Sequence, residues 1–164
     1  MSNLTDEMRA DILEKEDDLL EGLLAAANFA HDDALIKEMR VVREGRLYFK
    51  FRIRPLSDEE ATIARKNNTR YYDNPRGANL PKLPGETNED ALVREIIYRA
   101  TVEEDRAKTW DHPAFKANKN IANGMDAIGL LLLPGEIEFV HNTISKISGY
   151  GKAMENALVN EAKN

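Results

Sequence analysis

The residues that most often carry catalysis or bind metal ions are scarce and scattered in this sequence. There is no cysteine, and the three histidines, His31, His112 and His141, lie far apart. His31 is followed by Asp32 and Asp33, but adjacent residues on one segment seldom converge on a single ion. We therefore predict no metal site, and we interpret the histidines as a loop residue, a cap or turn residue and a helix-flank residue.

Motifs for nucleophilic attack and phosphate binding are missing as well. No thiolate nucleophile exists without cysteine, and the sequence holds no nucleophile elbow. The turn at Leu133–Glu136 contains one glycine, and its proline removes an N–H group that a phosphate-binding nest would use. Acid pairs such as Glu59-Glu60 stand at predicted helix starts, where capping explains them. We predict no catalytic residue and no cofactor, which favours a binding protein over an enzyme.

A basic segment raises a second possibility, recognition of phosphate. The 164-residue chain has a net charge of −6, yet residues 37–82 carry twelve basic and six acidic side chains. One hypothesis is a nucleic-acid-binding protein that uses a basic hairpin at residues 40–54. We favour the alternative, that Arg52 and Arg54 pair with protein acids or solvent, because an acidic chain exerts no long-range attraction on phosphate. The basic patch would comprise Arg40, Arg43, Arg46, Lys50, Arg52 and Arg54.

Leucines near the N-terminus provide a third candidate, an apolar surface for a protein partner. They lie at helical spacing within residues 5–30, with acids between them. Asp18 and Glu21 have the spacing of a capping box, so a second helix is expected near Leu19, and the segment forms either one bent helix or two short ones. The other interpretation of these leucines is ordinary core. The candidate partner-binding residues are Leu19, Leu20, Leu23, Leu24, Arg52 and Arg54.

The clearest strand signal is the alternation of apolar and mostly basic residues from Leu47 to Arg54. Gly45 offers the positive φ of a tight turn, and Pro55 ends the strand because it cannot donate to a ladder. An isolated hairpin is marginal in water, so its apolar face must lie on helices. We predict a mainly α (α+β) fold, a single compact helical domain over residues 1–164 with one antiparallel β-hairpin near residues 39–54.

Caps and prolines place the remaining helices. Ser57 and Glu60 have capping-box spacing, and Thr87 is expected to begin a later helix. Pro113 and Pro134 suit first helical positions. Residues 68–87 contain three prolines and no hydrophobic period, which predicts a long mobile surface loop.

The sequence also predicts a core residue and the structure at the end of the chain. Trp110, the only tryptophan, is interpreted as a core lid. Gly149 is expected to end the last strong helix in a left-handed conformation that folds Tyr150 back over Ile144. Residues 151–164 are predicted to be a tail or a short frayed helix. No signal-peptide pattern is present, and the apolar run at residues 130–133 is too short for a membrane span of roughly 20 residues.

Four short stretches, taken in order, resemble one protein family. They are Phe49–Ser57 (FKFRIRPLS, followed by three acids), Ala100–Glu103 (ATVE) after an amphipathic helix, Leu131–Glu136 (LLLPGE) and Ile147–Tyr150 (ISGY). Their order and spacing are similar to those of the XkdN-like tail assembly chaperones of long-tailed bacteriophages, prophages and the phage-tail-like bacteriocins of Gram-positive bacteria. The resemblance runs from residue 20 or so to residue 150.

The resemblance implies a small protein of the bacterial host cytoplasm that uses no catalysis, nucleotide or metal. Such chaperones bind the long, helical, apolar tape measure protein before the tail tube polymerises around it. In many related phages a programmed frameshift also makes a longer form, whose extension recruits the tail tube protein. Many copies would be needed along one long target, which is compatible with a homo-oligomer. Membrane and nucleic acid are not expected partners, and the family offers no catalytic residues to assign here.

Overall fold

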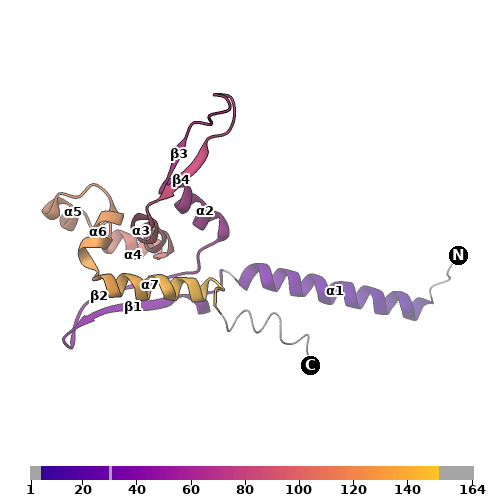
Figure 1. The fold of residues 1–164 in the computed structure, drawn as a ribbon. Coiled ribbons are helices and arrows are strands. Elements are labelled where there is room, and N and C mark those ends of the chain that lie inside the picture. The colour runs from indigo at the N-terminus through magenta and orange to yellow at the C-terminus, as the bar shows by residue number, and fades with distance from the viewer. Residues whose placement is uncertain (1–4, 30, 152–164) are drawn as a thin grey trace. The chain divides into compact units, whose positions relative to one another are not determined.

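The computed structural model describes residues 5–29 and 31–151 of the chain (Figure 1). These residues fall into two compact units, Met1–Leu35 and Ile36–Asn164. Helices predominate, and the second unit contains antiparallel strand pairs. The predicted fold class, mainly α with an antiparallel hairpin, is therefore confirmed, while the prediction of one domain over the whole chain stays a prediction.

The first unit consists mainly of one long helix, α1 (Asp6–Phe29), followed by a short 3₁₀ helix, η1 (Asp33–Leu35). Thr5 stands just before α1, and its Oγ1 accepts a hydrogen bond from the backbone N–H of Met8 at 3.3 Å. This bond satisfies one of the N–H groups that have no intrahelical partner in the first turn. The helix therefore begins where a capping side chain is available.

Helix α1 is uninterrupted, so the predicted start of a second helix near Leu19 is wrong. Asp18 and Glu21 have the spacing of a capping box, but they lie in the middle of a continuous helix. Backbone N–H groups there already donate to carbonyls one turn earlier, which leaves nothing for a cap to satisfy. The spacing of a cap is informative only where the preceding residues leave the helical conformation.

The second unit opens with the predicted hairpin, formed by β1 (Lys37–Arg43) and β2 (Arg46–Ile53). Glu44 and Gly45 both have positive φ, 52° and 78°, as a two-residue type I′ turn requires. The strands pair in antiparallel register, with a bulge between Val41 and Val42. The hairpin begins two residues earlier than predicted and is otherwise where the alternation placed it.

The next two helices along the chain begin at side-chain caps. The capping box of Ser57 and Glu60 is complete at the start of α2 (Asp58–Asn67), as predicted. Helix α3 (Glu89–Ala100) begins one residue later than expected, because the side chain of Asn88, and not that of Thr87, caps it by accepting from the Ala91 N–H. Amide and hydroxyl side chains at neighbouring positions compete for this role, and the backbone conformation decides between them.

Three short helices and one longer helix complete the described part of the unit. The short ones are α4 (Glu103–Lys108), which the sequence did not predict, α5 (Pro113–Lys119) and α6 (Gly124–Leu131), and the longer one is α7 (Pro134–Ile147). Pro113 and Pro134 occupy first-turn positions, as predicted, and the His112 side chain caps α5 by accepting from the Phe115 N–H. Figure 1 shows α7 running along the β1–β2 hairpin.

The segment predicted as a loop, residues 68–87, contains a second hairpin. Strands form near the beginning and at the end of this segment, so the loop prediction is wrong for those residues. Strands β3 (Thr69–Tyr72) and β4 (Leu83–Thr87) pair in antiparallel register and project from their unit (Figure 1). Pro84 is tolerated because each strand of a two-stranded sheet has a free edge. The Tyr72 ring covers Gly85 so closely that a Cβ there would lie 2.2 Å from a ring carbon. The prolines in this segment favoured a loop, so the sequence did not indicate these strands.

The core of the second unit is built around an aromatic cluster. Trp110 is fully buried, as predicted for a core lid, and its ring packs edge-on against Phe51 and Phe49 at centroid distances of 5.0 and 5.8 Å. Its indole N–H donates to the Thr101 hydroxyl at 2.9 Å. One face of the hairpin and the inner faces of α3, α6 and α7 supply the other buried side chains. These are Met39, Val41, Ile53, Ile97, Ala100, Ala127, Ile128, Leu132, Val140 and Ile144.

The last described residues form the predicted glycine closure, with one correction. Gly149 has a φ of 97°, and the N–H groups of Gly149 and Tyr150 donate to Lys146 and Ser145, the two bonds of a Schellman motif. The Tyr150 ring, however, stays 65% exposed, so it does not close the core as expected. The backbone bonds fix the turn without fixing the ring. Of the predicted tail at 151–164, only Gly151 lies within the described residues.

Candidate partner-binding surfaces

The four leucines predicted to bind a partner lie together on α1. Each residue of an α-helix advances by about 100°, so Leu19, Leu20, Leu23 and Leu24 fall on one side of the helix. Their side chains are between 55% and 64% exposed. No residue of α1 is buried, and residues 5–29 and 31–35 contain no second element long enough to cover this side. The helix therefore presents an apolar strip that its own unit leaves open.

The apolar strip extends over most of the helix length. Toward its N-terminal end it continues through Met8, Ile12 and Leu13, which are also exposed. Most acids of α1 project from the opposite side, because they lie about 180° around the helix from the leucines. This division into an apolar and an acidic face is the pattern of a helix that packs against another protein surface.

Arg52, a second predicted contact, is held within its own unit. Its Nε donates to Oδ2 of Asp105 at 3.0 Å, and its backbone N–H donates to the same oxygen at 2.7 Å. A further bond reaches Glu104 at 3.4 Å. The hydrogen bond from Arg52 lowers the pKa of Asp105 below its ordinary value. These contacts join β2 to α4. They neutralise the charge of Arg52 within the protein, so no external phosphate is needed to account for it.

Arg54 is held in the same way. Two of its guanidinium nitrogens donate to the carboxylate of Glu60 at 2.6 and 3.0 Å, the fork geometry that favours arginine over lysine. The same side chain donates to the carbonyl oxygens of Pro55 and Arg99. The hydrogen bonds from Arg54 lower the pKa of Glu60 from 4.5 to about 2. The predicted pairing of Arg52 and Arg54 with protein acids is confirmed.

The rest of the predicted basic patch is also largely neutralised. Arg40 and Lys50 both lie within 4.0 Å of Glu38, and Arg43 pairs with Glu136 at 2.7 Å. The Arg46 guanidinium lies over the ring of Tyr48, 4.9 Å from its centroid. Five of the six cations in the patch therefore form ion pairs within the described residues, an arrangement that gives the nucleic-acid hypothesis no support.

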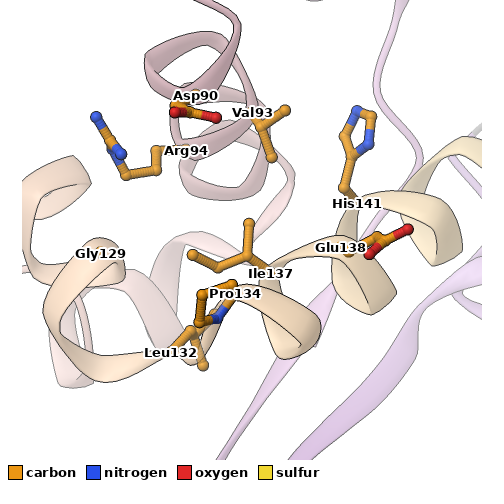
Figure 2. Close-up of a pocket in the computed structure, with 9 residues that line it drawn as sticks. All are labelled: Asp90, Val93, Arg94, Gly129, Leu132, Pro134, Ile137, Glu138 and His141. Atoms are coloured by element: carbon orange, nitrogen blue, oxygen red, sulfur yellow. The ribbon is translucent and has the colours of Figure 1, made fainter.

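A groove of about 440 Å³ lies between α3 and the corner formed by α6 and α7, and Figure 2 shows the residues that line it. Ile137 and Val93 lie across from one another within it. Burial lowers the pKa of His141, which favours the neutral form of its imidazole. Titratable side chains line the groove, but no hydrogen bond or ion pair connects them among the described residues. They are Asp90, Arg94, Glu138 and His141.

A second groove, of about 420 Å³, lies between β1 and α7. Met39, Val41 and Val140 line it, and the ring of Phe139 stands at its edge, 65% exposed. The helical period of α7 does not indicate Phe139, because this residue lies off the stripe that predicts burial. An aromatic residue outside that stripe was the available signal.

Two further findings concern the described residues only. They hold no cluster of histidine, cysteine, aspartate and glutamate side chains arranged to bind a metal ion. None of their helices is long and apolar enough to cross a membrane. His31 lies in the first unit, whereas His112 and His141 lie in the second, before α5 and on α7.

A known protein family matches most of the chain. The model of the family described as "Phage XkdN-like tail assembly chaperone protein, TAC" matches residues 21–163. No curated protein and no solved structure matches the chain. The matched range includes the hairpins, helices α2 to α7 and the last part of α1. Leu23 and Leu24 fall inside it, and Leu19 and Leu20 precede it.

Proposed function

Because the chain belongs to the XkdN-like phage tail assembly chaperone family, we propose that it binds the tape measure protein and keeps it soluble while the tail tube assembles. Membership of the family makes the chain a phage tail assembly chaperone with phage tail proteins as partners. Three points are proposed. The specific partner is the tape measure protein, the chain keeps that protein soluble, and it acts in the host cytoplasm by binding alone.

The observation that supports this proposal is the open apolar face of α1. Leu19, Leu20, Leu23 and Leu24 are more than half exposed, although such side chains gain roughly 1.5 to 3 kcal/mol each when fully buried. A contiguous apolar surface of this kind is typical of an interaction site. A long helical protein with apolar faces is a fitting partner, since two amphipathic helices can cover each other's strips.

The chaperone effect follows from the same contact. A tape measure chain without its tube exposes apolar surface, which associates with that of other chains because water excludes both. A bound copy of α1 would cover part of that surface and present its acidic face to solvent instead. Like charges on neighbouring bound copies would then keep the assemblies apart.

The test is co-expression of the tape measure protein with the parent chain or with Leu19→Gln/Leu23→Gln. Glutamine has a helix propensity close to that of leucine, so α1 should remain helical while its strip becomes polar. The matched control is Leu130→Gln, which changes a leucine of the second unit that is 60% exposed. The readouts are the soluble fraction of the tape measure protein and the helix content of each variant by circular dichroism.

We expect the parent and Leu130→Gln to keep the tape measure protein soluble and the double variant to lose most of this effect. Equal activity of all three proteins would overturn the assignment of the face to α1. No solubilisation by the parent would overturn the proposed function itself.

A further inference from the structure

Helix α1 carries one carboxylate inside its apolar face. Residues three or four positions apart are neighbours on a helix surface. For Glu16 these neighbours are all apolar: Ile12 and Leu13 on one side along the axis, Leu19 and Leu20 on the other. Glu16 is itself exposed and lies at the centre of the strip rather than on its acidic border.

Glu16 has no cationic partner among the described residues of its unit. Among residues 5–29 one ion pair lies within 4.0 Å, between Lys15 Nζ and Asp11 Oδ2 at 3.3 Å. Any protein that covers the strip must also take the Glu16 carboxylate out of water. Burial of an ionised carboxylate is strongly unfavourable unless a cation and hydrogen-bond donors meet it.

The charge of the whole helix favours the same kind of partner. Between Asp6 and Phe29 there are eight acidic and two basic residues, a net charge of −6. Such a helix attracts basic surfaces and repels acidic ones over about 10 Å at 0.1 M salt. We propose that α1 selects an amphipathic helix of the tail partner that bears a lysine or arginine within its apolar stripe, where the cation meets Glu16. This inference rests on the proposed function.

A second copy of α1 fits the strip less well. A parallel pair places one Glu16 carboxylate beside the other. An antiparallel pair that joins Arg9 to Glu16 sets Leu19 and Leu20 opposite Asp6 and Thr5, so the most apolar part of the strip has no apolar partner. The charge pattern therefore points to a different chain with basic residues in its stripe.

The experiment measures binding of two synthetic helical peptides to the full chain by fluorescence anisotropy. Both peptides carry the same leucine stripe, interrupted at its centre by lysine in one and by glutamate in the other. The test variant is Glu16→Gln and the matched control is Glu14→Gln. Glu14 is also exposed, but it lies about 200° around the helix from Glu16, on the acidic face. Each titration is made at 0.1 M and at 1 M salt.

We expect the parent to bind the lysine peptide roughly tenfold more tightly than the glutamate peptide, with a smaller ratio at 1 M salt. Glu16→Gln should remove most of this preference, and Glu14→Gln should leave it within about twofold. Equal affinities for the two peptides, or equal effects of the two variants, would overturn the inference.

Co-expression with the tape measure protein separates this inference from the proposed function. If solubilisation depends on Leu19 and Leu23 while Glu16→Gln behaves as Glu14→Gln does, the function stands and the charge selection is wrong. Sedimentation of the chain alone tests the other occupant. A dimer that Leu19→Gln/Leu23→Gln converts to monomer would place a second copy on the strip and overturn the inference.

Discussion

Helices α1 and α7 both carry apolar residues at helical spacing, but their surroundings differ. In α7 the stripe side chains Val140 and Ile144 are buried in the core of the second unit. In α1 the corresponding leucines remain open within the first unit. The periodicity of apolar residues thus locates the face of a helix that will be covered, but it does not tell whether the same chain or another protein covers it.

Charged residues show the same contrast. In the second unit Arg43, Arg52 and Arg54 are each fixed by a carboxylate from a different element. In α1 one ion pair lies within 4.0 Å, Lys15 with Asp11, and Glu16 is left without a cation. The sequence does not distinguish an acid that pairs within the fold from an acid that has no cation beside it. The structure distinguishes them by the side chains that it places next to each acid.

The largest expected change in the free energy of unfolding comes from a comparison of packing in the two units. Trp110→Ala removes a fully buried ring and its bond to Thr101, and should lower the free energy of unfolding by about 3 to 5 kcal/mol. Leu23→Ala on α1 should lower it by less than about 1 kcal/mol. Urea denaturation followed by circular dichroism measures both. A Leu23→Ala effect as large as that of Trp110→Ala would show that α1 is packed within its own chain.

Two glycines should respond to alanine with opposite signs. A Cβ on Gly124 would lie 2.6 Å from an Asp111 oxygen, 2.7 Å from the Tyr98 ring and 3.1 Å from Trp110 Cβ, so Gly124→Ala should cost about 1 to 3 kcal/mol. A Cβ on Gly22 meets no atom within 4 Å, and Gly22→Ala should stabilise α1 by about 1 kcal/mol. Thermal unfolding curves provide the comparison, and destabilisation by Gly22→Ala would show that this helix has a close neighbour.

The Arg54–Glu60 pair should make stability depend on acid pH. The pKa of Glu60 is lowered from 4.5 to about 2, so its contribution is present above pH 4.5 and is lost as pH falls toward 2. With partial screening by solvent, we expect Glu60→Gln to cost about 1 to 2 kcal/mol at neutral pH and little at pH 2. Urea curves across this range test the effect. The control is Glu59→Gln, which alters an exposed neighbour, and an identical pH profile for both variants would contradict the prediction.

The smallest effects concern the end of α7. Gly149→Ala should cost about 1 kcal/mol, because a Cβ disfavours a φ of 97°. Tyr150→Ala should cost less than about 1 kcal/mol, since its ring is mostly exposed. Denaturation curves and tape measure co-expression are measured together. Loss of solubilisation by a Tyr150→Ala variant of unchanged stability would add this end of the second unit to the partner-binding surface.

Local signals in the sequence were sufficient for several elements. The alternation at residues 47–54, the Ser57–Glu60 box and the first-turn prolines each depend on neighbouring residues, so they could be recognised without tertiary information. The second hairpin could not, because its strands are short and one of them contains Pro84 and Gly85, residue types that are depleted in strands. Helix α4 could not be predicted either, because six residues are too few to show a helical period.

The order of residue types alone accounts for the family resemblance, the mainly helical class, the first hairpin and the apolar strip on α1. All of these reside in the order and spacing of residue types, which local sterics and hydrophobicity translate directly into structure. The folded structure was needed to identify Asp105 and Glu60 as the partners of Arg52 and Arg54, since these acids lie on other elements. It also showed that Tyr150 stays outside the core, because burial depends on what surrounds a side chain rather than on its place in the sequence.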